Sequence, residues 1–189
     1  MIEDIFEKIT EEYCEISPEA IFDWSQRIKI IEHKKKHLLI KEGSYSTKFY
    51  YIIKGAVKAY YLLDEKEITD WFAFQNDFIP STTNHLIGQK SNHYIELLED
   101  SILIELTNTD LEEICKNHHD FEHLYRLTLS KVIYQLRERI ASLQFRTVKQ
   151  RYDSLIELHP TIESRVPLGD IASYLGITQE SLSRIRASK

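Results

Sequence analysis

The sequence predicts an α+β protein in which an antiparallel sheet is followed by a long helix and a C-terminal helix-turn-helix. Between residues 28 and 106, short stretches rich in Ile, Tyr, Phe and Val are separated by Gly43, Gly55 and polar turn residues, which is typical of antiparallel strands. Beyond residue 109 the apolar residues recur at helical spacing, and residues 119–146 contain neither Gly nor Pro.

Two helices are expected before the sheet. The apolar residues of the first segment lie at helical spacing, and Ser17-Pro18 combines an N-cap with a proline at the first helical position. The first helix is predicted over 2–13, and the strands are predicted at 38–40, 49–53, 57–63, 68–74, 94–98 and 102–106.

A predicted capping box marks the return to helix, with Thr109 as N-cap and Glu112 at N3. The next helix, at about 119–146, would be roughly 38 Å long. A sheet domain of this size would not cover all of it, so we interpret it as a dimerisation helix; a helix buried against its own domain is the alternative. Its heptad seam consists of Leu129, Ile133, Leu136, Ile140 and Leu143.

Composition and charge exclude several classes of protein. No apolar run approaches the roughly 18 residues that span a bilayer, and the acidic start of the chain does not resemble a secretory signal. Cys14 and Cys115 form no CxxC pair, so we expect a cytoplasmic protein with reduced thiols. The net charge of −6 divides into −9 for 1–136 and +3 for 137–189. Only the C-terminal part is therefore suited to phosphate contact.

Residues 166–185 carry the strongest motif, two short helices joined by a tight turn. Gly176 supplies the turn, where a positive φ costs glycine little, and the Thr178 hydroxyl caps the second helix. Ala172 is small enough for a close helix crossing. The residues expected to face inward are Ile171, Ala172, Leu175, Ile177, Leu182 and Ile185.

The outward face of the second helix has the chemistry of base reading, although a solvated hairpin would also expose polar residues. Arg184 could donate two hydrogen bonds to guanine, and Glu180 could accept one from cytosine. Arg186, Lys189 and Lys149 are the candidates for phosphate contact. The predicted DNA-binding residues are Gln179, Glu180, Ser183, Arg184, Arg186 and Lys189.

The segment Thr178-Gln179-Glu180-Ser181-Leu182-Ser183-Arg184 resembles the second helix of the helix-turn-helix in the cAMP receptor protein/FNR family, which typically reads Ser/Thr-Arg-Glu-Thr-Val-Ser/Gly-Arg. The family's base-reading positions correspond to Gln179, Glu180 and Arg184, and Gln179 replaces the usual Arg. The resemblance implies a homodimeric transcription regulator, with double-stranded DNA, RNA polymerase and an unidentified small-molecule effector as partners and without a membrane.

The resemblance extends to the first part of the chain. Lys41-Glu42-Gly43, 49–57 and Asn76-Asp77-Phe78-Ile79 are similar to the family's cyclic-nucleotide-binding β-roll, a double-stranded β-helix. The implied organisation is a sensor domain at 1–118, a dimerisation helix at 119–146 and a DNA-binding domain at 147–189.

The residues that hold a cyclic nucleotide in this family are replaced. Pro80 and Ser81 stand where the family has Gly-Glu, and Ser91 and Asn92 stand where it has Arg-Ser. A cyclic phosphate without a bidentate cation would lose its hydration for little return, and the neighbouring Lys90 is only a point charge. We therefore expect that the protein does not bind cAMP in the usual manner.

Other chemistries are less favoured. Two cysteines cannot supply the four ligands of an iron–sulfur cluster. Cys115, His119 and His123 have metal-ligand spacing, but their neighbours indicate a solvated face. We expect no metal, no cofactor and no catalytic residues. Two alternatives to a regulator are a small-molecule-binding module whose C-terminal helices contact proteins and a cupin-like enzyme, which would need metal-binding histidines such as His85 and His93 on strands.

Overall fold

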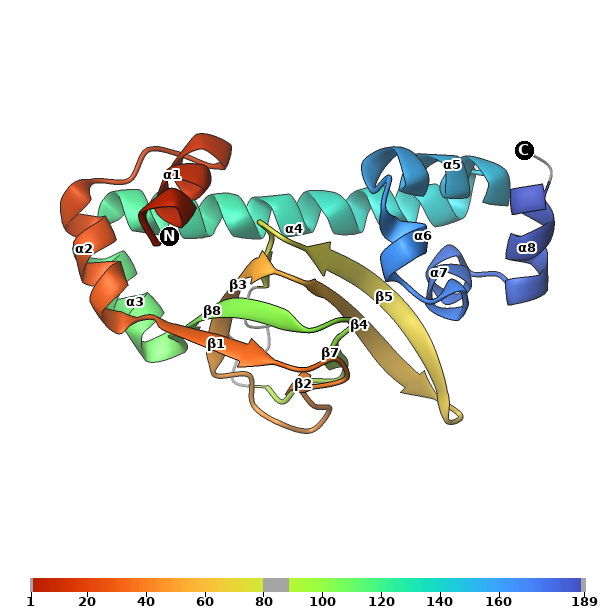
Figure 1. The fold of residues 1–189 in the computed structure, drawn as a ribbon, viewed down its shortest axis with the longest axis horizontal. Helices are drawn as coiled ribbons and strands as arrows, with labels where there is room; N and C mark the ends of the chain where they lie inside the picture. The colour runs from red at the N-terminus through yellow and green to blue at the C-terminus, as the bar shows by residue number, and fades with distance from the viewer. Residues whose placement is uncertain (1, 80–88, 188–189) are drawn as a thin grey trace.

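The computed structural model describes residues 2–79 and 89–187, which form eight helices and eight strands (Figure 1). The helices are α1 (Ile2–Glu12), α2 (Pro18–Arg27), α3 (Asn108–Asn117), α4 (His119–Phe145), α5 (Val148–Leu158), α6 (Ile162–Arg165), α7 (Leu168–Leu175) and α8 (Gln179–Ala187). The strands are β1 (Lys29–His33), β2 (Leu38–Ile40), β3 (Lys48–Lys54), β4 (Ala56–Leu63), β5 (Lys66–Phe74), β6 (Phe78–Ile79), β7 (Tyr94–Leu97) and β8 (Ser101–Thr107).

The strands form two four-stranded antiparallel sheets, ordered β1-β8-β3-β6 and β2-β7-β4-β5. Side chains alternate across each strand, so one face of each sheet contributes to a shared apolar interior. The residues at the centre of this interior are fully buried: Ile52, Val57, Ala59, Ile79, Ile95, Leu97 and Leu103. The predicted α+β fold with an antiparallel β-roll is confirmed.

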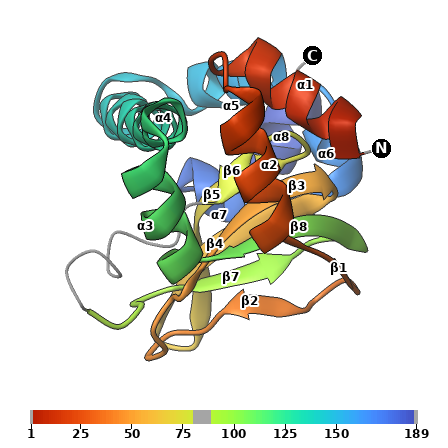
Figure 2. The same ribbon diagram turned by 90° about the vertical axis from the view of Figure 1, so that its left-hand side faces the viewer.

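The N-terminal helices cover the outer face of the first sheet. Trp24 of α2 packs between Phe6 of α1 and Phe121 of α4, with ring centroids 4.9 Å apart in both contacts. Ser17 accepts a hydrogen bond from the Ala20 backbone, so the predicted N-cap of α2 is confirmed. Figure 2 shows these helices gathered at the N-terminal end of α4, above the roll.

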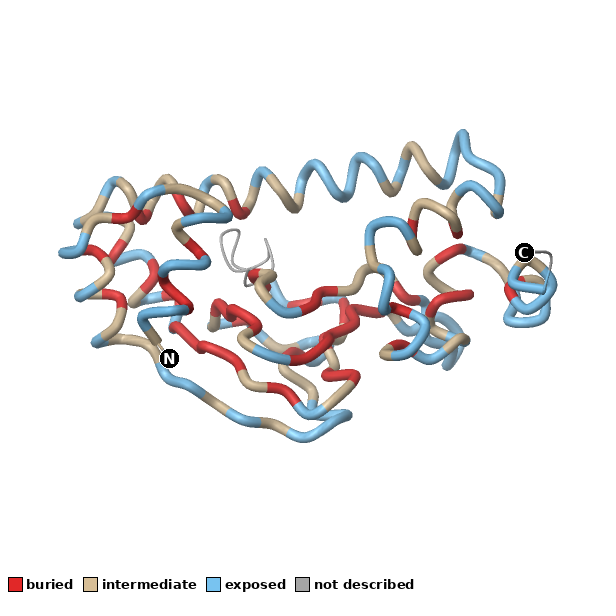
Figure 3. Tube along the Cα trace, turned by 45° about the horizontal axis from the view of Figure 1, so that its top comes forward, coloured by how far each residue is buried: buried red, intermediate tan, exposed pale blue. Residues whose placement is uncertain are grey.

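The C-terminal helices pack against the outer face of the second sheet. Ala56 of β4 and Phe74 of β5 share one apolar cluster with residues of α5, α7 and α8. Helix α4 runs along the molecule from the N-terminal helices to this cluster (Figure 1). Its second half is largely exposed, as the colours of Figure 3 show.

Two local predictions are corrected. The N-cap of α3 is Thr107, whose hydroxyl accepts a hydrogen bond from the Asp110 backbone at 3.1 Å, and Thr109 lies within the first turn. Both threonines precede an acidic residue by three positions, and β8 runs to Thr107, so its hydroxyl is the one at the helix start. In addition, the short helix α6, for which no element was predicted, separates α5 from the helix-turn-helix. Within the described ranges, none of the helices combines the length and apolar character needed to cross a bilayer.

Candidate nucleic-acid interface

The helix-turn-helix is built by α7, α8 and the turn between them. Gly176 has φ +69°, which only glycine adopts without cost, and it ends α7. The Ser181 backbone donates to the Thr178 hydroxyl at 3.2 Å, so Thr178 caps α8 as predicted. Ile171, Ala172 and Leu175 are buried, as predicted for the inward face of α7.

The second helix presents one apolar face inward and one polar face to solvent. Leu182 is fully buried, and Ile177 and Ile185 pack half-buried against the same cluster. The side chains of Gln179, Glu180, Ser183 and Arg184 lie on the exposed face. Helix α8 itself lies at the end of the molecule opposite α1, α2 and α3 (Figure 1). The candidate base-reading residues therefore share one open surface.

Glu180 is held in its ionised form. Hydrogen bonds from its own backbone amide and from Thr178 lower its pKa, and the charge of Arg184 does so as well. An ionised carboxylate can only accept hydrogen bonds. This is the protonation state required for a contact with the amino group of cytosine.

The two predicted phosphate-contact residues that the structure describes are already paired with carboxylates. The Arg186 guanidinium forms an ion pair with Glu163 of α6 at 2.7 Å, and Lys149 forms one with Asp153 at 2.6 Å. Lys189 lies outside the described residues. Arg186 and Lys149 would therefore have to exchange a carboxylate for a phosphate. The spacing of Lys149 and Asp153 on one helix indicates their pairing, whereas nothing in the sequence indicates that of Arg186 and Glu163.

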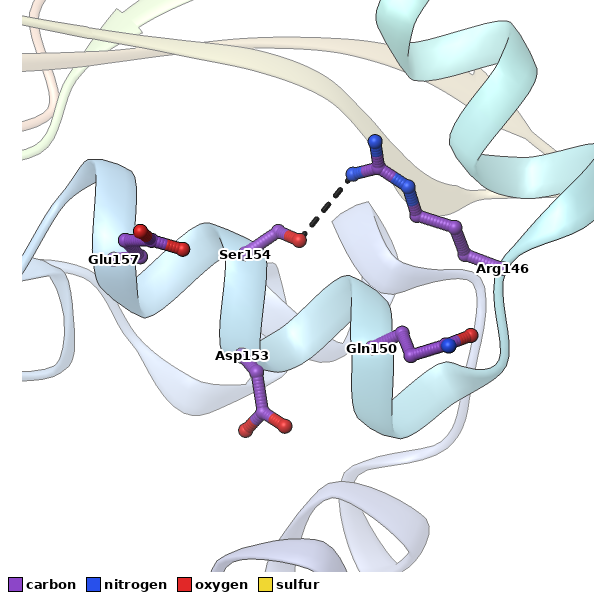
Figure 4. Close-up of a pocket in the computed structure, with 5 residues that line it drawn as sticks. All are labelled: Arg146, Gln150, Asp153, Ser154 and Glu157. Atoms are coloured by element: carbon purple, nitrogen blue, oxygen red, sulfur yellow. Dashed lines mark hydrogen bonds between the residues drawn. The ribbon is translucent and has the colours of Figure 1, made fainter.

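A polar depression lies beside the interface on α5. Arg146 points toward Ser154 and donates a hydrogen bond at 3.3 Å, while Asp153 and Glu157 project from the same helix (Figure 4). The depression is lined by more carboxylates than cations, so phosphate contact is not favoured there.

The heptad seam is an apolar stripe with almost no cover. Leu129 is half-buried, whereas Ile133, Leu136, Ile140 and Leu143 are exposed. The helix residues that contact the protein's own body lie on a different face, and among them are Lys131 and Arg139. The alternative of a helix buried along its length against its own domain is therefore not observed.

Comparison with known proteins identifies the fold. Residues 30–118 match the family model "Cyclic nucleotide-binding domain". FixK2 from Bradyrhizobium japonicum superposes with a TM-score of 0.73 at 19% identity, covering 85% of this chain and 83% of that protein. A regulator assigned to the Crp/Fnr family from Eubacterium rectale gives 0.70 at 18% identity, covering 90% and 82%. This chain has the Crp/Fnr fold.

A third relative of this fold is the c-di-GMP-responsive global regulator CLP of Xanthomonas campestris, with a TM-score of 0.73, 15% identity and coverage of 91% of both chains. No curated protein matches the chain in sequence. The resemblance to the cAMP receptor protein/FNR family predicted from the sequence is confirmed at the level of the fold.

Part of the region that binds a cyclic nucleotide in such domains lies within the described residues. The Ser91 hydroxyl is buried, donates to the His93 carbonyl at 2.8 Å and accepts from the His93 amide. Lys90 lies over the ring of Tyr45, 5.8 Å from its centroid. Pro80, Ser81 and His85 lie outside the described residues. The Ser91 hydroxyl is therefore occupied by hydrogen bonds to the backbone of His93. That the protein does not bind cAMP in the usual manner stays a prediction.

The candidate metal ligands do not converge. Burial raises the pKa of the Cys115 thiol to about 11, so this group stays protonated. His119 is exposed, and the His123 ring lies 2.7 Å from the Arg126 guanidinium. Across 2–79 and 89–187 no set of three or more metal-binding side chains gathers. His93 is buried in the bend that precedes β7, beside Tyr61, and burial lowers its pKa.

Proposed function

We propose that the protein is a cytoplasmic, homodimeric, sequence-specific DNA-binding transcription regulator. The observation that carries the proposal is the capped helix α8, whose polar face lies open at one end of a Crp/Fnr fold. Double-stranded DNA is the direct partner. RNA polymerase and a small-molecule effector are the further partners that such a regulator would have. We divide the chain into a sensor domain at 1–118, the dimerisation helix at 119–146 and the DNA-binding domain at 147–189.

The dimer is proposed to form through the α4 seam. Four large aliphatic side chains exposed on one helix face at heptad spacing would gain about 25 cal/mol for each Å² of apolar surface removed from water. A second copy carries the same stripe and fits a two-fold axis along the helix. Two-fold symmetry would present two α8 helices to successive major grooves, about 34 Å apart.

The sensor domain is proposed to lack the usual cAMP response. Ser91 stands at the position expected for the phosphate-binding Arg, and its hydroxyl is already bonded to His93. Calorimetry with cAMP tests this point, and we expect no binding in the micromolar range. A micromolar dissociation constant would show that another residue of the chain replaces the Arg.

Selection of bound duplexes from a random pool tests the DNA-binding function. We expect a near-palindromic site, and we expect Arg184→Ala to weaken binding by about 1–3 kcal/mol and to relax one base pair in each half-site. Lys149→Ala is the matched loss of one positive charge. It should weaken all sequences alike and reduce the salt dependence, because a phosphate contact carries no sequence information.

An Arg184→Ala protein with unchanged affinity and unchanged sequence preference at fixed salt would show that α8 is not the reading helix. Absence of any selected sequence with the purified dimer would contradict the proposed function as a whole.

A further inference from the structure

Helix α7 is held on the second sheet by a buried lysine. The Lys58 side chain of β4 is only 6% exposed, and its ammonium group pairs both with Glu67 of β5 and with Asp170 of α7, the latter at 3.2 Å. The same ammonium lies 4.8 Å from the centroid of the Tyr60 ring. One cation therefore joins two strands of the roll to the first helix of the helix-turn-helix, 112 residues away.

Further polar contacts cross the same boundary. The Thr69 backbone donates to the Ser173 hydroxyl at 2.9 Å, and Arg139 of α4 donates to the backbone carbonyls of both Thr69 and Tyr174. Arg165 of α6 pairs with Glu99 and donates to the Gly55 carbonyl at 2.8 Å. Helices α6 and α7 are thus tied to fixed points on the roll and on α4.

The charges around Lys58 make its loss costly. Burial raises the pKa of Glu96 on β7; Lys58 lowers it, and Glu67 and Asp170 raise it. Without the lysine, Glu67 and Asp170 would lose the cation that they share, and Glu96 would keep only the charge of Lys36 nearby. Removal of one partner from a buried ion pair is strongly destabilising because the remaining charges have lost their hydration.

The covalent connection alone does not fix the helix-turn-helix. Helix α4 ends at Phe145 and α5 begins at Val148, and Arg146 between them is extended, with φ −102° and ψ 142°. Rotation about so short a link would carry α5 to α8 as a unit. The contacts of α6 and α7 with the sheet are therefore what sets the position of α8 relative to α4.

We infer that Lys58 and Asp170 are positioning residues for DNA recognition: their ion pair holds α7 on the β4–β5 hairpin and thereby sets the half-site spacing that the dimer accepts. This inference rests on the proposed function. One extra base pair between the half-sites increases their separation by about 3.4 Å and rotates one half-site relative to the other about the duplex axis. A helix-turn-helix fixed to the roll cannot follow that change, whereas a released one can.

The test compares Lys58→Met and Asp170→Asn with Lys66→Met, which removes an exposed lysine from the same hairpin. Asp170→Asn leaves the Lys58–Glu67 pair intact, so the roll keeps its charge balance even if Lys58→Met does not fold. Affinity is measured on the selected site and on versions with the spacer lengthened or shortened by one base pair.

Wild type and Lys66→Met should lose about tenfold or more for each change of spacer, a loss comparable to that of one mismatched base pair. Asp170→Asn and Lys58→Met should bind the optimal spacer more weakly and discriminate between spacers by less than about threefold, because a helix-turn-helix held by fewer contacts can shift to fit each spacer. Equal spacer discrimination in Asp170→Asn and wild type would overturn the inference and leave the proposed function standing.

Hydrogen exchange without DNA gives a second readout. The Thr69 amide, which donates to Ser173, should exchange faster in Asp170→Asn than in wild type and should be unchanged in Lys66→Met. Unchanged exchange in Asp170→Asn would overturn the inference whatever the chain binds. If wild type bound no specific sequence, the proposed function and the spacing statement would both fail, even if the exchange result held.

Discussion

The interior of the β-roll and the seam of α4 bury their aliphatic side chains to opposite extents. Ile52 and Leu103 in the roll have no exposed surface, whereas Ile133 and Ile140 on the seam are 59% and 56% exposed. Both sets have the same chemistry, so the difference lies in what covers them. The roll covers its own apolar residues with two sheets, whereas one copy of the chain leaves most of the seam exposed.

The roll is stabilised by contacts within one chain, whereas the seam can be covered only when two chains associate. The roll and the helices packed on it contain three buried apolar clusters formed within a single copy. The second half of α4 supplies none of the described residues of these clusters, and it contacts the body through polar groups such as Arg139. Substitutions in the two regions should therefore change different measurable quantities.

A charge on the seam should have the largest effect. Ile140→Lys would place an unpaired ammonium at the centre of the proposed interface, at a cost of several kcal/mol in association. Sedimentation should show a monomer at micromolar concentration, while the circular dichroism of the folded chain is retained. Gln135→Lys introduces the same side chain at an exposed position off the seam and should remain dimeric. A dimeric Ile140→Lys protein would place the interface elsewhere.

A cavity in the roll should have the next largest effect, on folding instead of association. Leu103→Ala removes a fully buried side chain and should lower the free energy of unfolding by about 2–5 kcal/mol in a urea titration. The subunit association of the folded protein should not change. The exposed Leu63, truncated in the same way, should cost less than about 0.5 kcal/mol. Similar losses at both sites would mean that the roll interior is not the stabilising core.

The turn of the helix-turn-helix lies close to the seam and should be moderately sensitive. Gly176→Ala puts a Cβ at φ +69° and should cost about 1–2 kcal/mol in thermal unfolding. The added methyl would lie 3.8 Å from Leu143, an ordinary contact, so the strain is confined to the backbone. Gly169→Ala, inside α7, should be neutral or slightly stabilising. Equal effects of the two would contradict the left-handed turn.

Acid should have the smallest effect, where the C-terminal helices pack on the roll. Burial lowers the pKa of His159, whose ring packs on Phe74 of β5, 4.7 Å between centroids. The unfolded chain then holds more protons than the folded one, so stability is full above about pH 6.5 and falls as pH drops toward the lowered pKa. The slope of unfolding free energy against pH between 7.5 and 5 should decrease in His159→Phe, which keeps an aromatic ring on Phe74.

The buried His93 of the roll has the same sign of shift and would maintain part of that slope in His159→Phe. Replacement of His93 by an uncharged residue is the control, because it should reduce the slope of unfolding free energy against pH without affecting the contacts of α5. An unchanged slope in both variants would assign the acid sensitivity to the carboxylates.

Features set by neighbouring residues could be predicted from the sequence. The cap at Ser17, the turn at Gly176 and the cap at Thr178 follow from local chemistry, and each appears where it was expected. The seam on α4 follows from periodicity in the same way. The cap of α3 was misplaced because Thr107 and Thr109 offer the same spacing to an acidic residue, and only the end of β8 distinguishes them.

Features that join distant segments could not be predicted. Nothing near Arg186 in the sequence indicates that Glu163 lies 2.7 Å away, and nothing near Lys58 indicates Asp170. Salt-bridge partners that lie far apart in the sequence carry no periodic signal, since many acidic residues are equivalent candidates. The docking of the helix-turn-helix on the roll therefore emerges only from the tertiary structure.

Lys131 and Arg139 fasten the middle of helix α4 to the body. Lys131 contacts Tyr13 and Asp77, and Arg139 contacts Thr69 and Tyr174. A helix advances about 1.5 Å and turns about 100° with each residue, so a single insertion between these points would swing Arg139 away from β5. This stretch can therefore change in length only by steps that restore the angular phase of the helix, whereas the β4–β5 turn at Asp64-Glu65 carries no such restriction.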